Sequence, residues 1–430
     1  MANAGTIKVG LLGLGTVGAG VAQILLDPKG RHPLLAEVHL HRVGVRSLHK
    51  PRALHLPPGL LTTDVTGLVQ DPEIDVVVEV LGGLEPARSL MLQAIAAGKH
   101  VVTANKAVMA RYGAELFQAA QAQGVYVLME GAVGGGIPII HPLKQALGAN
   151  RLTRVMGIVN GTTNFILTQM MQGRGDFATA LATAQALGYA EADPRADIDG
   201  EDAADKITIL ATLAFGVQVN REQVYWEGIG GIQPVDLRYA ERLGFQVKLL
   251  ALAQRQGEFL DIRVHPTLIS QDHPLASVQG VQNAIVLGGE PLGEVMFQGP
   301  GAGAGPTASA VVGDVVNVVA TLRAGSGYHP LLGSQVTTPI PQLPMDEVQT
   351  RFYTRILTQD QPGVIGQLGT CFGQHGVSLA SVIQIGTHEQ LAEIVVVTHQ
   401  VREGNFWLAL EEIRQFPAVD HIPTVLRVWA

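Results

Sequence analysis

The feature that most constrains how this chain folds is a glycine-rich turn directly after an apolar stretch. Residues 7–12 read Ile-Lys-Val-Gly-Leu-Leu, and a helical pattern covers residues 19–26. Between them, a first glycine permits a tight turn, a second lets the backbone approach a phosphate, and a third lets the helix pack on the strand. The unpaired N–H groups at the helix start favour an anion. We therefore expect a dinucleotide pyrophosphate, rather than an ordinary strand-turn-helix, at Gly13, Gly15, Thr16, Val17 and Gly18.

Strand and helix patterns alternate through residues 1–138, which is typical of a parallel sheet in an α/β fold. Strands are expected over 38–45, 74–81, 100–104 and 125–129, and helices over 87–97 and 112–123. The segment after the second strand contains Arg46, Lys50 and Arg52, with no acidic residue at the place where NAD-binding folds carry one. This pattern favours NADP over NAD, and a solvated basic loop is the alternative.

The rest of the chain divides into further parts. Residues 139–300 mix strand patterns (154–159, 260–268, 284–288) with helical ones (165–171, 177–187, 202–215), which predicts a second, α+β domain. A glycine-rich stretch at 299–305 precedes an apolar helical run over 307–322. Residues 328–350 are rich in proline and threonine and are expected to form a linker. Residues 351–430 follow a strand-helix-strand-strand-helix-strand order.

Composition excludes several classes of protein. The formal charge is −8 over 430 residues, which argues against a general affinity for nucleic acid, because phosphate backbones need a cationic face. The single cysteine, Cys371, rules out an internal disulfide and fits a reducing compartment. We find no secretory pattern and no run of about 18 apolar residues, so we expect no membrane association and a cytoplasmic location.

The richest polar segment covers residues 188–206 and holds seven acidic residues. Asp202 and Lys206 fall four residues apart on an expected helix, so their side chains share one face. A lysine beside a carboxylate can take a hydroxyl proton or polarise a carbonyl oxygen. An amino-acid substrate would also need a carboxylate for its ammonium group, and Glu191 and Asp202 qualify. A surface ion pair and a solvated, calcium-binding acidic loop are the alternatives.

Two further segments contain small polar or flexible residues. Residues 130–138 include three adjacent glycines, which suit an anion or a hard monovalent cation held by backbone oxygens. A flexible turn with Pro138 at the first position of a helix is the alternative. Residues 160–164 read Asn-Gly-Thr-Thr-Asn, a dense set of small hydrogen-bond donors and acceptors, and a role of Asn164 as the cap of the following helix is the alternative.

Five segments in this order resemble the homoserine dehydrogenase family over essentially the whole chain: 13–18, 103–106, 130–138, 160–166 and 188–206. The resemblance implies the reversible, NAD(P)-dependent interconversion of L-homoserine and L-aspartate 4-semialdehyde, on the route to threonine, methionine and isoleucine. It also implies a Rossmann-type domain over 1–138 and a substrate-binding and dimerisation domain over 139–300. The segment 301–327 then returns to the nucleotide-binding domain, with Gly303 near the cofactor.

The same resemblance implies roles for individual residues. Lys206 matches the general acid–base lysine, with Asp202 beside it in the substrate site. Glu191 matches a carboxylate that binds substrate, and Asp197 matches a neighbouring polar contact. Lys106 matches a lysine between cofactor and substrate. A sodium-like cation would be held largely by the backbone oxygens of Glu130, Val133, Gly135 and Ile137.

The C-terminal part, residues 351–430, resembles the ferredoxin-like ACT module. Its ligand loop would lie between the first strand and the first helix, at Asp360 and Gly363. This implies regulation by an amino acid such as threonine, and a module that only mediates subunit contacts is the alternative. A homodimer or a homotetramer is expected.

Two rival functions fit the residues less well. An aldehyde dehydrogenase acting on the same semialdehyde needs a cysteine nucleophile, but Cys371 is far in sequence from every cofactor signal. A non-catalytic sensor of a dinucleotide and an amino acid would leave the acidic segment with its lysine unexplained.

Overall fold

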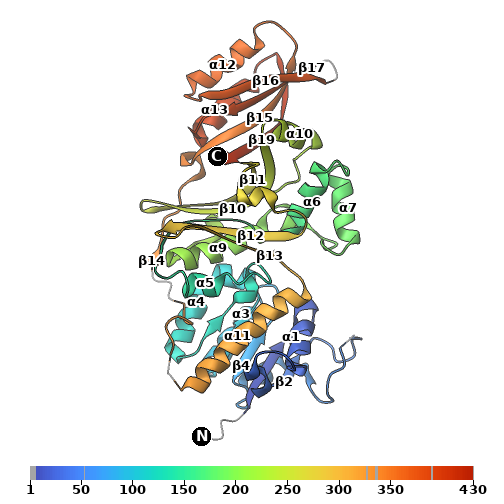
Figure 1. Ribbon diagram of the computed structural model, residues 1–430, viewed down its shortest axis with the longest axis vertical. Helices are drawn as coiled ribbons and strands as arrows, with labels where there is room; N and C mark the ends of the chain where they lie inside the picture. Colours follow the sequence, from blue (N-terminus) through green and yellow to red (C-terminus); the bar gives the residue numbers. More distant parts are fainter. Residues whose placement is uncertain (1–5, 53, 326–327, 335–337, 389–390, 430) are drawn as a thin grey trace. The chain divides into compact units, whose positions relative to one another are not determined.

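The computed structural model describes residues 6–52, 54–325, 328–334, 338–388 and 391–429 (Figure 1). These residues fall into two compact units. The first unit consists of Met1–Val155, Asp205–Glu222 and Asn283–Ile340, and the second of Met156–Ala204, Gln223–Gln282 and Pro341–Ala430. Three elements include a border between the units: β7 (Arg151–Ile158), α9 (Glu201–Phe215) and β12 (Gln282–Glu290).

The first unit is built on a six-stranded parallel sheet in the order β3-β2-β1-β4-β5-β6. This strand order is that of a Rossmann-type dinucleotide-binding fold, so the expectation of that fold is confirmed. The strands are β1 (Ile7–Leu12), β2 (Val38–Gly44), β3 (Leu61–Thr62), β4 (Val76–Glu79), β5 (His100–Thr103) and β6 (Val127–Leu128). The helices are α1 (Thr16–Leu26), α2 (Val65–Gln70), α3 (Ala87–Ala96), α4 (Lys106–Gln123), α5 (Ile140–Lys144) and α11 (Ala304–Ala324).

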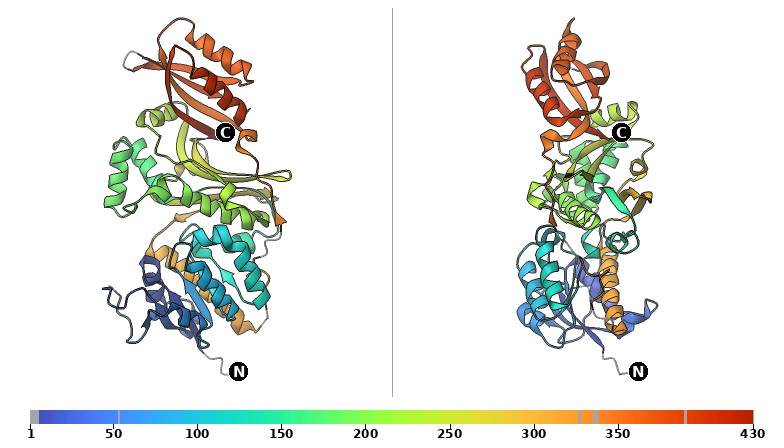
Figure 2. Two further views of the ribbon diagram at one scale, coloured as in Figure 1. Left: turned by 180° about the vertical axis from the view of Figure 1, so that it is seen from behind. Right: turned by 90° about the vertical axis from the view of Figure 1, so that its left-hand side faces the viewer.

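Helices cover both faces of this sheet, with α3 and α4 on one face and α1 and α11 on the other (Figure 2). The apolar side of α11 joins the hydrophobic core formed with β1 and α1. Gly20 of α1 allows the two helices to approach closely, because a Cβ atom there would lie 2.8 Å from the Ala304 carbonyl oxygen. By length and composition alone α11 could cross a membrane. Its packing is instead that of a core helix, whose apolar residues contact other apolar residues of the unit.

The second unit contains a mixed sheet in which strands follow the order β10-β11-β19-β15-β17-β16. Only the β11–β19 pair on this path is parallel, and the other pairs are antiparallel. Its strands are β9 (Tyr225–Trp226), β10 (Phe245–Gln256), β11 (Phe259–Ser270), β15 (Gln349–Gln359), β16 (Leu379–His388), β17 (Leu391–Thr398), β18 (Val401–Arg402) and β19 (Val419–Trp429). Its helices are α6 (Gly161–Met171), α7 (Phe177–Ala186), α8 (Arg195–Ile198), α10 (Pro234–Arg242), α12 (Val364–Gln374) and α13 (Glu403–Ile413).

The C-terminal part of the second unit has the expected ferredoxin-like order β15-α12-β16-β17-α13-β19. Helices α12 and α13 lie side by side, drawn in orange and red in Figures 1 and 2. Their apolar sides share one core with the strands, in which the rings of Phe352 and Phe406 stack with centroids 3.8 Å apart. The expected ACT module is therefore confirmed.

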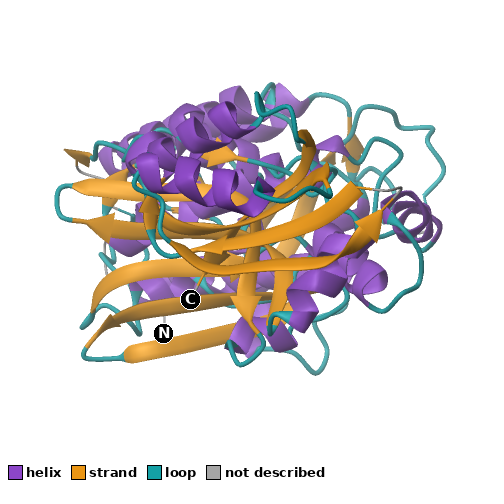
Figure 3. Ribbon diagram, turned by 90° about the horizontal axis from the view of Figure 1, so that it is seen from above, coloured by secondary structure: helices purple, strands orange, loops and turns teal. Residues whose placement is uncertain are grey.

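The remaining elements are short or extend the two units. They are β8 (Val217–Gln218), β13 (Gly293–Pro300) and β14 (Thr338–Pro339), with 3₁₀ turns at Pro33–Glu37, Glu130–Ala132, Arg221–Gln223, Pro274–Ser277 and Met345–Glu347. Figure 3 distinguishes the helices, strands and loops of the described residues by colour. The expected linker over 328–350 thus contains a short strand and a turn. Its residues 335–337, and residues 326–327 of the segment before it, lie outside the described residues.

Two local predictions were wrong, and one long strand was missed. Helix α4 begins at Lys106 and not at residue 112, because the Asn105 side chain accepts a hydrogen bond from the Val108 N–H and caps the helix. Asn160, and not Asn164, caps α6. The long strand β10 was missed, since its sequence is rich in Leu, Ala and Gln, which favour helices, and its pairing with a neighbouring strand overrides that local preference.

Candidate functional site

The glycine-rich turn has the geometry that its spacing predicts. Gly13 has a φ of +101°, which the tight turn requires and which glycine adopts without strain. A Cβ atom at Gly18 would lie 2.2 Å from the Gly13 carbonyl oxygen, so α1 packs directly on the turn. At Gly15 no atom lies within 4 Å of an added Cβ, which leaves the backbone open to a ligand.

A cleft of about 830 Å³ lies at this turn within the first unit. Both Gly15 at the start of α1 and Gly303 at the start of α11 act as N-caps without a side-chain hydrogen bond. The residues that follow them, Thr16 and Ala304, line the same cleft. Helix N-termini carry partial positive charge and unpaired N–H groups, so this cleft suits the pyrophosphate of a dinucleotide.

Basic side chains lie along one side of the cleft. Lys50 and Arg52 line it, together with Arg31, which the sequence interpretation missed because it lies outside the segment after β2. The Arg52 guanidinium donates hydrogen bonds to the carbonyl oxygens of Ser47, Leu48 and Lys50 and thereby holds the loop in shape. Arg46 is exposed and is not among the residues that line the cleft.

A buried carboxylate organises the ends of β4 and β5, where Lys106 follows. Glu79 accepts hydrogen bonds from the Thr103 hydroxyl at 2.6 Å and from the Leu81 N–H at 2.7 Å. Burial raises the pKa of Glu79, and these hydrogen bonds oppose that shift. The Asn105 amide reaches the Gly83 carbonyl oxygen at 2.8 Å. The network fixes where α4 begins and so where Lys106 lies.

Helix α9 carries the two residues expected to act in proton transfer. Lys206 is 8% exposed and Asp202 is 5% exposed, so neither is a solvated surface group, as a surface ion pair would be. Between them in sequence, Asp205 makes ion pairs with Arg221 at 2.6 Å and with Arg111 of α4 at 3.0 Å. These pairs tie α9 to the helix that begins at Lys106.

Asn160 joins the acidic residues of the second unit. Its amide donates to Asp197 at 2.7 Å and to Asp202 at 2.9 Å, and its oxygen accepts from the Thr163 N–H in the first turn of α6. The Thr162 hydroxyl also contacts Asp197. Asn160 therefore joins Asp197 and Asp202 into one hydrogen-bonded group. Sequence reasoning missed Asn160 as their bridge, because the motif alone does not show which asparagine caps the helix.

Glu191 and Asn164 make other contacts. The Glu191 side chain is exposed on the loop before α8, and its carbonyl oxygen accepts a hydrogen bond from Gln185. The Asn164 amide donates to three carbonyl oxygens of the loop after β11, at Val278, Gly280 and Gln282. Asn164 thus holds a loop and does not cap a helix.

The glycine segment 130–138 is a tight turn of the first unit. The Glu130 carboxylate accepts hydrogen bonds from the N–H groups of Ile139, Ile140 and His141, while Asp314 accepts from the Glu130 N–H. Burial and the charge of Asp314 raise the pKa of Glu130. Because the Glu130 carboxylate already accepts hydrogen bonds from three backbone N–H groups, the group that Glu130 could offer a cation is its backbone carbonyl oxygen. The helix that follows, α5, begins at Ile140, so Pro138 does not open it.

The expected ligand loop of the ACT module lies between β15 and α12. Gly363 is the N-cap of α12 with a φ of +93°, and the exposed Asp360 accepts a hydrogen bond from the Gln384 amide at 3.3 Å.

Three family models match the chain. They are described as "Homoserine dehydrogenase, NAD binding domain" over residues 13–130, "Homoserine dehydrogenase" over 138–316 and "ACT domain" over 352–418. A homoserine dehydrogenase of Synechocystis is 59% identical, with 98% of this chain and 99% of that protein covered. One of Bacillus subtilis is 42% identical, with 98% of each covered.

Solved structures give the same result. The crystal structure of a homoserine dehydrogenase from Thiobacillus denitrificans is 43% identical, with a TM-score of 0.91 and 98% of each chain covered. A hyperthermophilic archaeal homoserine dehydrogenase in complex with NADPH is 29% identical, with a TM-score of 0.61, covering 75% of this chain and 99% of its own. These relatives are named as enzymes and give no support to a non-catalytic sensor. The chain therefore belongs to the homoserine dehydrogenase family of NAD(P)-using oxidoreductases and carries a C-terminal ACT domain.

Proposed function

We propose that Lys206 moves the proton in the reversible interconversion of L-homoserine and L-aspartate 4-semialdehyde. The burial of Lys206 on α9, one helical turn from buried Asp202, is the observation that carries this assignment. A buried amine can take the hydroxyl proton of homoserine and return it to the aldehyde. When bound, the nicotinamide accepts or returns the hydride.

The neighbouring residues bind and orient the substrate in this proposal. Asp202 and Asp197, held together by Asn160, give a fixed negative region, and the exposed Glu191 adds a carboxylate for the substrate ammonium group. Lys106 contributes positive charge at the start of α4, which the pairing of Arg111 with Asp205 ties to α9.

Replacing Lys206 with methionine tests the assignment. We expect kcat to fall by about 10²–10⁴, which is the contribution of general acid–base catalysis, with the KM for the cofactor nearly unchanged. Lys99→Met is a matched control, because Lys99 is a buried lysine of the same unit at the start of β5, bonded to the carbonyl oxygens of Asp71 and Ile74. Equal activity of the two variants would overturn the assignment.

For the cofactor we propose NADP, with NAD as the weaker ligand. The cleft fits a dinucleotide, because two helix N-termini without a side-chain cap lie at its edge. The residues that we propose to contact the cofactor there are Gly13, Gly15, Thr16, Val17, Gly18 and Gly303. Lys50, which lines the cleft, would pair with the 2′-phosphate, and we propose Arg46, which follows β2, as a second partner. Replacing Lys50 or Arg46 with glutamine is expected to raise the KM for NADP at least about tenfold, as loss of one charged contact would, while that for NAD stays unchanged. An equal change for both cofactors would contradict this choice.

We also propose a bound monovalent cation, probed as Na⁺, at the backbone oxygens of Glu130, Val133, Gly135 and Ile137. The positive φ of Gly134 and Gly135 bends this segment into a turn, and carbonyl oxygens suit hard cations. Replacing sodium with tetramethylammonium in the buffer should lower the thermal midpoint of unfolding, and an unchanged midpoint would count against the site.

For regulation we propose that an amino acid, threonine in the first test, binds at Asp360 and Gly363. The loop position and the left-handed Gly363 support this. Inhibition by threonine that disappears in Asp360→Asn is the expected result, and inhibition retained in the variant would refute it.

Assembly, location and domain borders remain part of the proposal. The exposed Val382 and Ile383 on β16, the last strand in the sheet order, support a homodimer or homotetramer, which sedimentation would show. We propose a cytoplasmic location, which fits one buried, reduced cysteine. We also propose domain borders at 1–138, 139–300, 301–327, 328–350 and 351–430; the matched family regions begin near two of them, at 138 and 352.

A further inference from the structure

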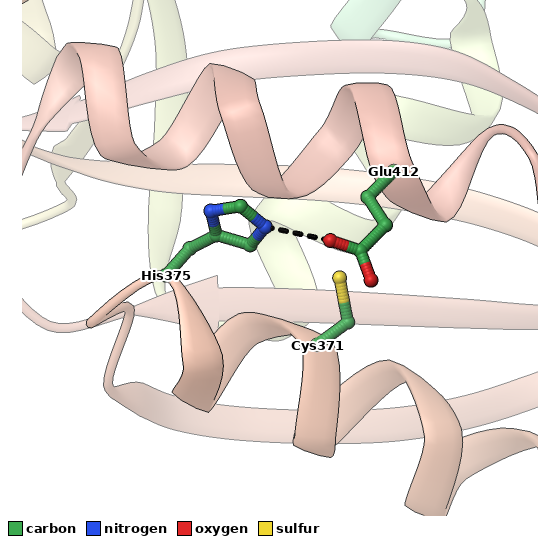
Figure 4. Close-up of side chains that lie close together, drawn as sticks. All are labelled: Cys371, His375 and Glu412. Atoms are coloured by element: carbon green, nitrogen blue, oxygen red, sulfur yellow. Dashed lines mark hydrogen bonds and ion pairs between the residues drawn. The ribbon is translucent and has the colours of Figure 1, made fainter.

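Helices α12 and α13 of the ACT domain bring a cysteine, a histidine and a glutamate together (Figure 4). Cys371 and His375 are four residues apart along α12 and its C-cap, so they share one face. Glu412 extends from α13 toward both of them. The His375 Nε2 atom lies 2.8 Å from a Glu412 carboxylate oxygen, and one ligand atom from each of the three residues lies within 4.8 Å of the others.

The exposure of the three side chains forms a gradient from solvent to core. Cys371 is 1% exposed, whereas the side chains of His375 and Glu412 are 25% and 47% exposed. A small ion could therefore reach the sulfur atom past two side chains that are able to move. In tetrahedral coordination with bonds of about 2.0–2.3 Å, ligand atoms lie roughly 3.5 Å apart. To reach that geometry, the widest separation in the set, up to 4.8 Å, would shrink by about 1 Å, and the His375 Nε2 atom and the Glu412 oxygen, now 2.8 Å apart, would move slightly apart.

The chemistry of the set selects one class of ion. A thiolate and an imidazole favour zinc and other late first-row transition metals over magnesium or calcium, which prefer oxygen ligands. Three protein ligands and a water molecule complete a four-coordinate zinc site. We propose that Cys371, His375 and Glu412 bind one divalent transition metal ion, with zinc as the preferred ion.

Two other groups of potential ligands in the described part of the chain are weaker candidates. The group of Glu130, His141 and Asp314 has no sulfur atom, and its carboxylate oxygens already accept hydrogen bonds from backbone N–H groups and His141. The group of His41, Asp71 and Glu73 also lacks sulfur. The ACT group alone among these three combines soft and hard ligands.

Metal binding replaces the proton of the Cys371 thiol, which is released to solvent. In the metal-free protein the Cys371 thiol donates a hydrogen bond to the Ala409 carbonyl oxygen at 3.6 Å, so the sulfur carries a proton. The metal takes the place of this proton and of the hydrogen bond between His375 and Glu412. The two helices, which meet through apolar contacts and the His375–Glu412 hydrogen bond, would exchange that hydrogen bond for a coordinate link.

Titration of the full chain with Co²⁺ tests the site, in the presence of a phosphine reductant and without a polyhistidine tag. Since Cys371 is the only cysteine in the chain, any sulfur-to-cobalt charge-transfer band in the near ultraviolet must come from it. We expect this band to saturate at one equivalent and to disappear when Zn²⁺ is added. Absence of the band in the wild-type protein overturns the proposal.

Variants separate the three ligands. Cys371→Ser removes the band, while His375→Gln and Glu412→Gln weaken Co²⁺ binding at least about tenfold, because even loss of a residue that only supports a ligand costs that much. The matched control is His421→Gln, which removes another histidine paired with a carboxylate, that of Asp420 at 2.6 Å. This control should bind Co²⁺ like the wild type. His375→Gln and Glu412→Gln change side chains that are at least partly exposed, so these two variants test the site even where Cys371→Ser fails to fold. Wild-type affinity in both of them overturns the proposal.

Discussion

Replacement of two glycines of the same turn should separate cofactor binding from folding. Gly18→Ala would place a methyl group 2.2 Å from the Gly13 carbonyl oxygen and 3.2 Å from a Val80 methyl group, where ordinary contacts begin at 3.4 Å. The first of these neighbours is backbone and cannot rotate away, so α1 must shift by about 1 Å, and overpacking of this kind costs roughly 1–3 kcal/mol. The shift also moves the helix N-terminus that faces the cleft.

Gly15→Ala is the counterpart in which no packing changes. Its φ is −83°, which alanine adopts readily, and an added Cβ meets no atom within 4 Å. The change in stability should stay below about 1 kcal/mol, which is the cost of a poorer N-cap. The methyl group would, however, occupy the place where the backbone approaches the pyrophosphate. We expect the Kd for NADPH to rise at least about tenfold, or about 1.4 kcal/mol.

Two measurements on each variant are sufficient. Fluorescence titration with NADPH gives the Kd, and denaturant unfolding gives the stability of the variant relative to the wild type. Gly15→Ala should lose affinity alone, and Gly18→Ala should lose both affinity and stability. Wild-type affinity in Gly15→Ala would refute the assignment of the cleft to the cofactor, and wild-type stability in Gly18→Ala would refute the packing argument.

Three further changes test other parts of the molecule. Asn160→Ala removes an N-cap and the bridge between two carboxylates, so it should cost about 2–4 kcal/mol in denaturant unfolding and raise the KM for homoserine. Arg355→Met leaves the fully buried Asp236 without its 2.7 Å ion pair, which should cost about 3–5 kcal/mol by the same measurement. Burial lowers the pKa of His100 to about 4, so between pH 6.5 and 4 the unfolded chain binds more protons than the folded one. Stability should therefore fall by about 2 kcal/mol from pH 7 to pH 5, and His100→Gln should remove this loss, as thermal unfolding at both pH values would show.

Matched controls keep these results specific. Asp176→Ala removes the exposed N-cap of α7 and should cost only about 1 kcal/mol, without a change in the KM for homoserine. Arg402→Met removes exposed ion pairs with Asp346 and Glu347, which are worth less than about 1 kcal/mol. If either control matched its buried counterpart, the reasoning from burial would be wrong. A His100→Gln variant that is as acid-sensitive as the wild type would contradict the titration argument.

The glycine turn was predictable from sequence because its constraints are local. The roles of Gly13 and Gly18 follow from spacing between one strand and the next helix, and the structure shows the expected positive φ and close packing. The alternation of strands and helices likewise defined the parallel sheet. By contrast, the start of α4 depended on Asn105, whose side chain reaches Val108 and Gly83 at once.

Contacts between distant segments could not be predicted from one sequence. Nothing near Arg31 shows that it lines a cleft with Lys50, because the fold alone brings them together. The same holds for Arg111 and Asp205, which are 94 residues apart. The pairing of Asp202 with Lys206 was predictable, because residues four positions apart on a helix lie on the same face. Only the structure shows that both side chains are buried.

Amine rescue of Lys206→Ala tests the central claim most directly, because it asks whether an amine at this position carries the proton. The measurement is kcat for homoserine oxidation in the variant, with and without added methylamine, alongside the Kd for NADPH. The account predicts a loss of at least about 100-fold in kcat, an unchanged Kd, and a partial recovery that rises with the methylamine concentration. A variant that keeps wild-type kcat without any amine would contradict it.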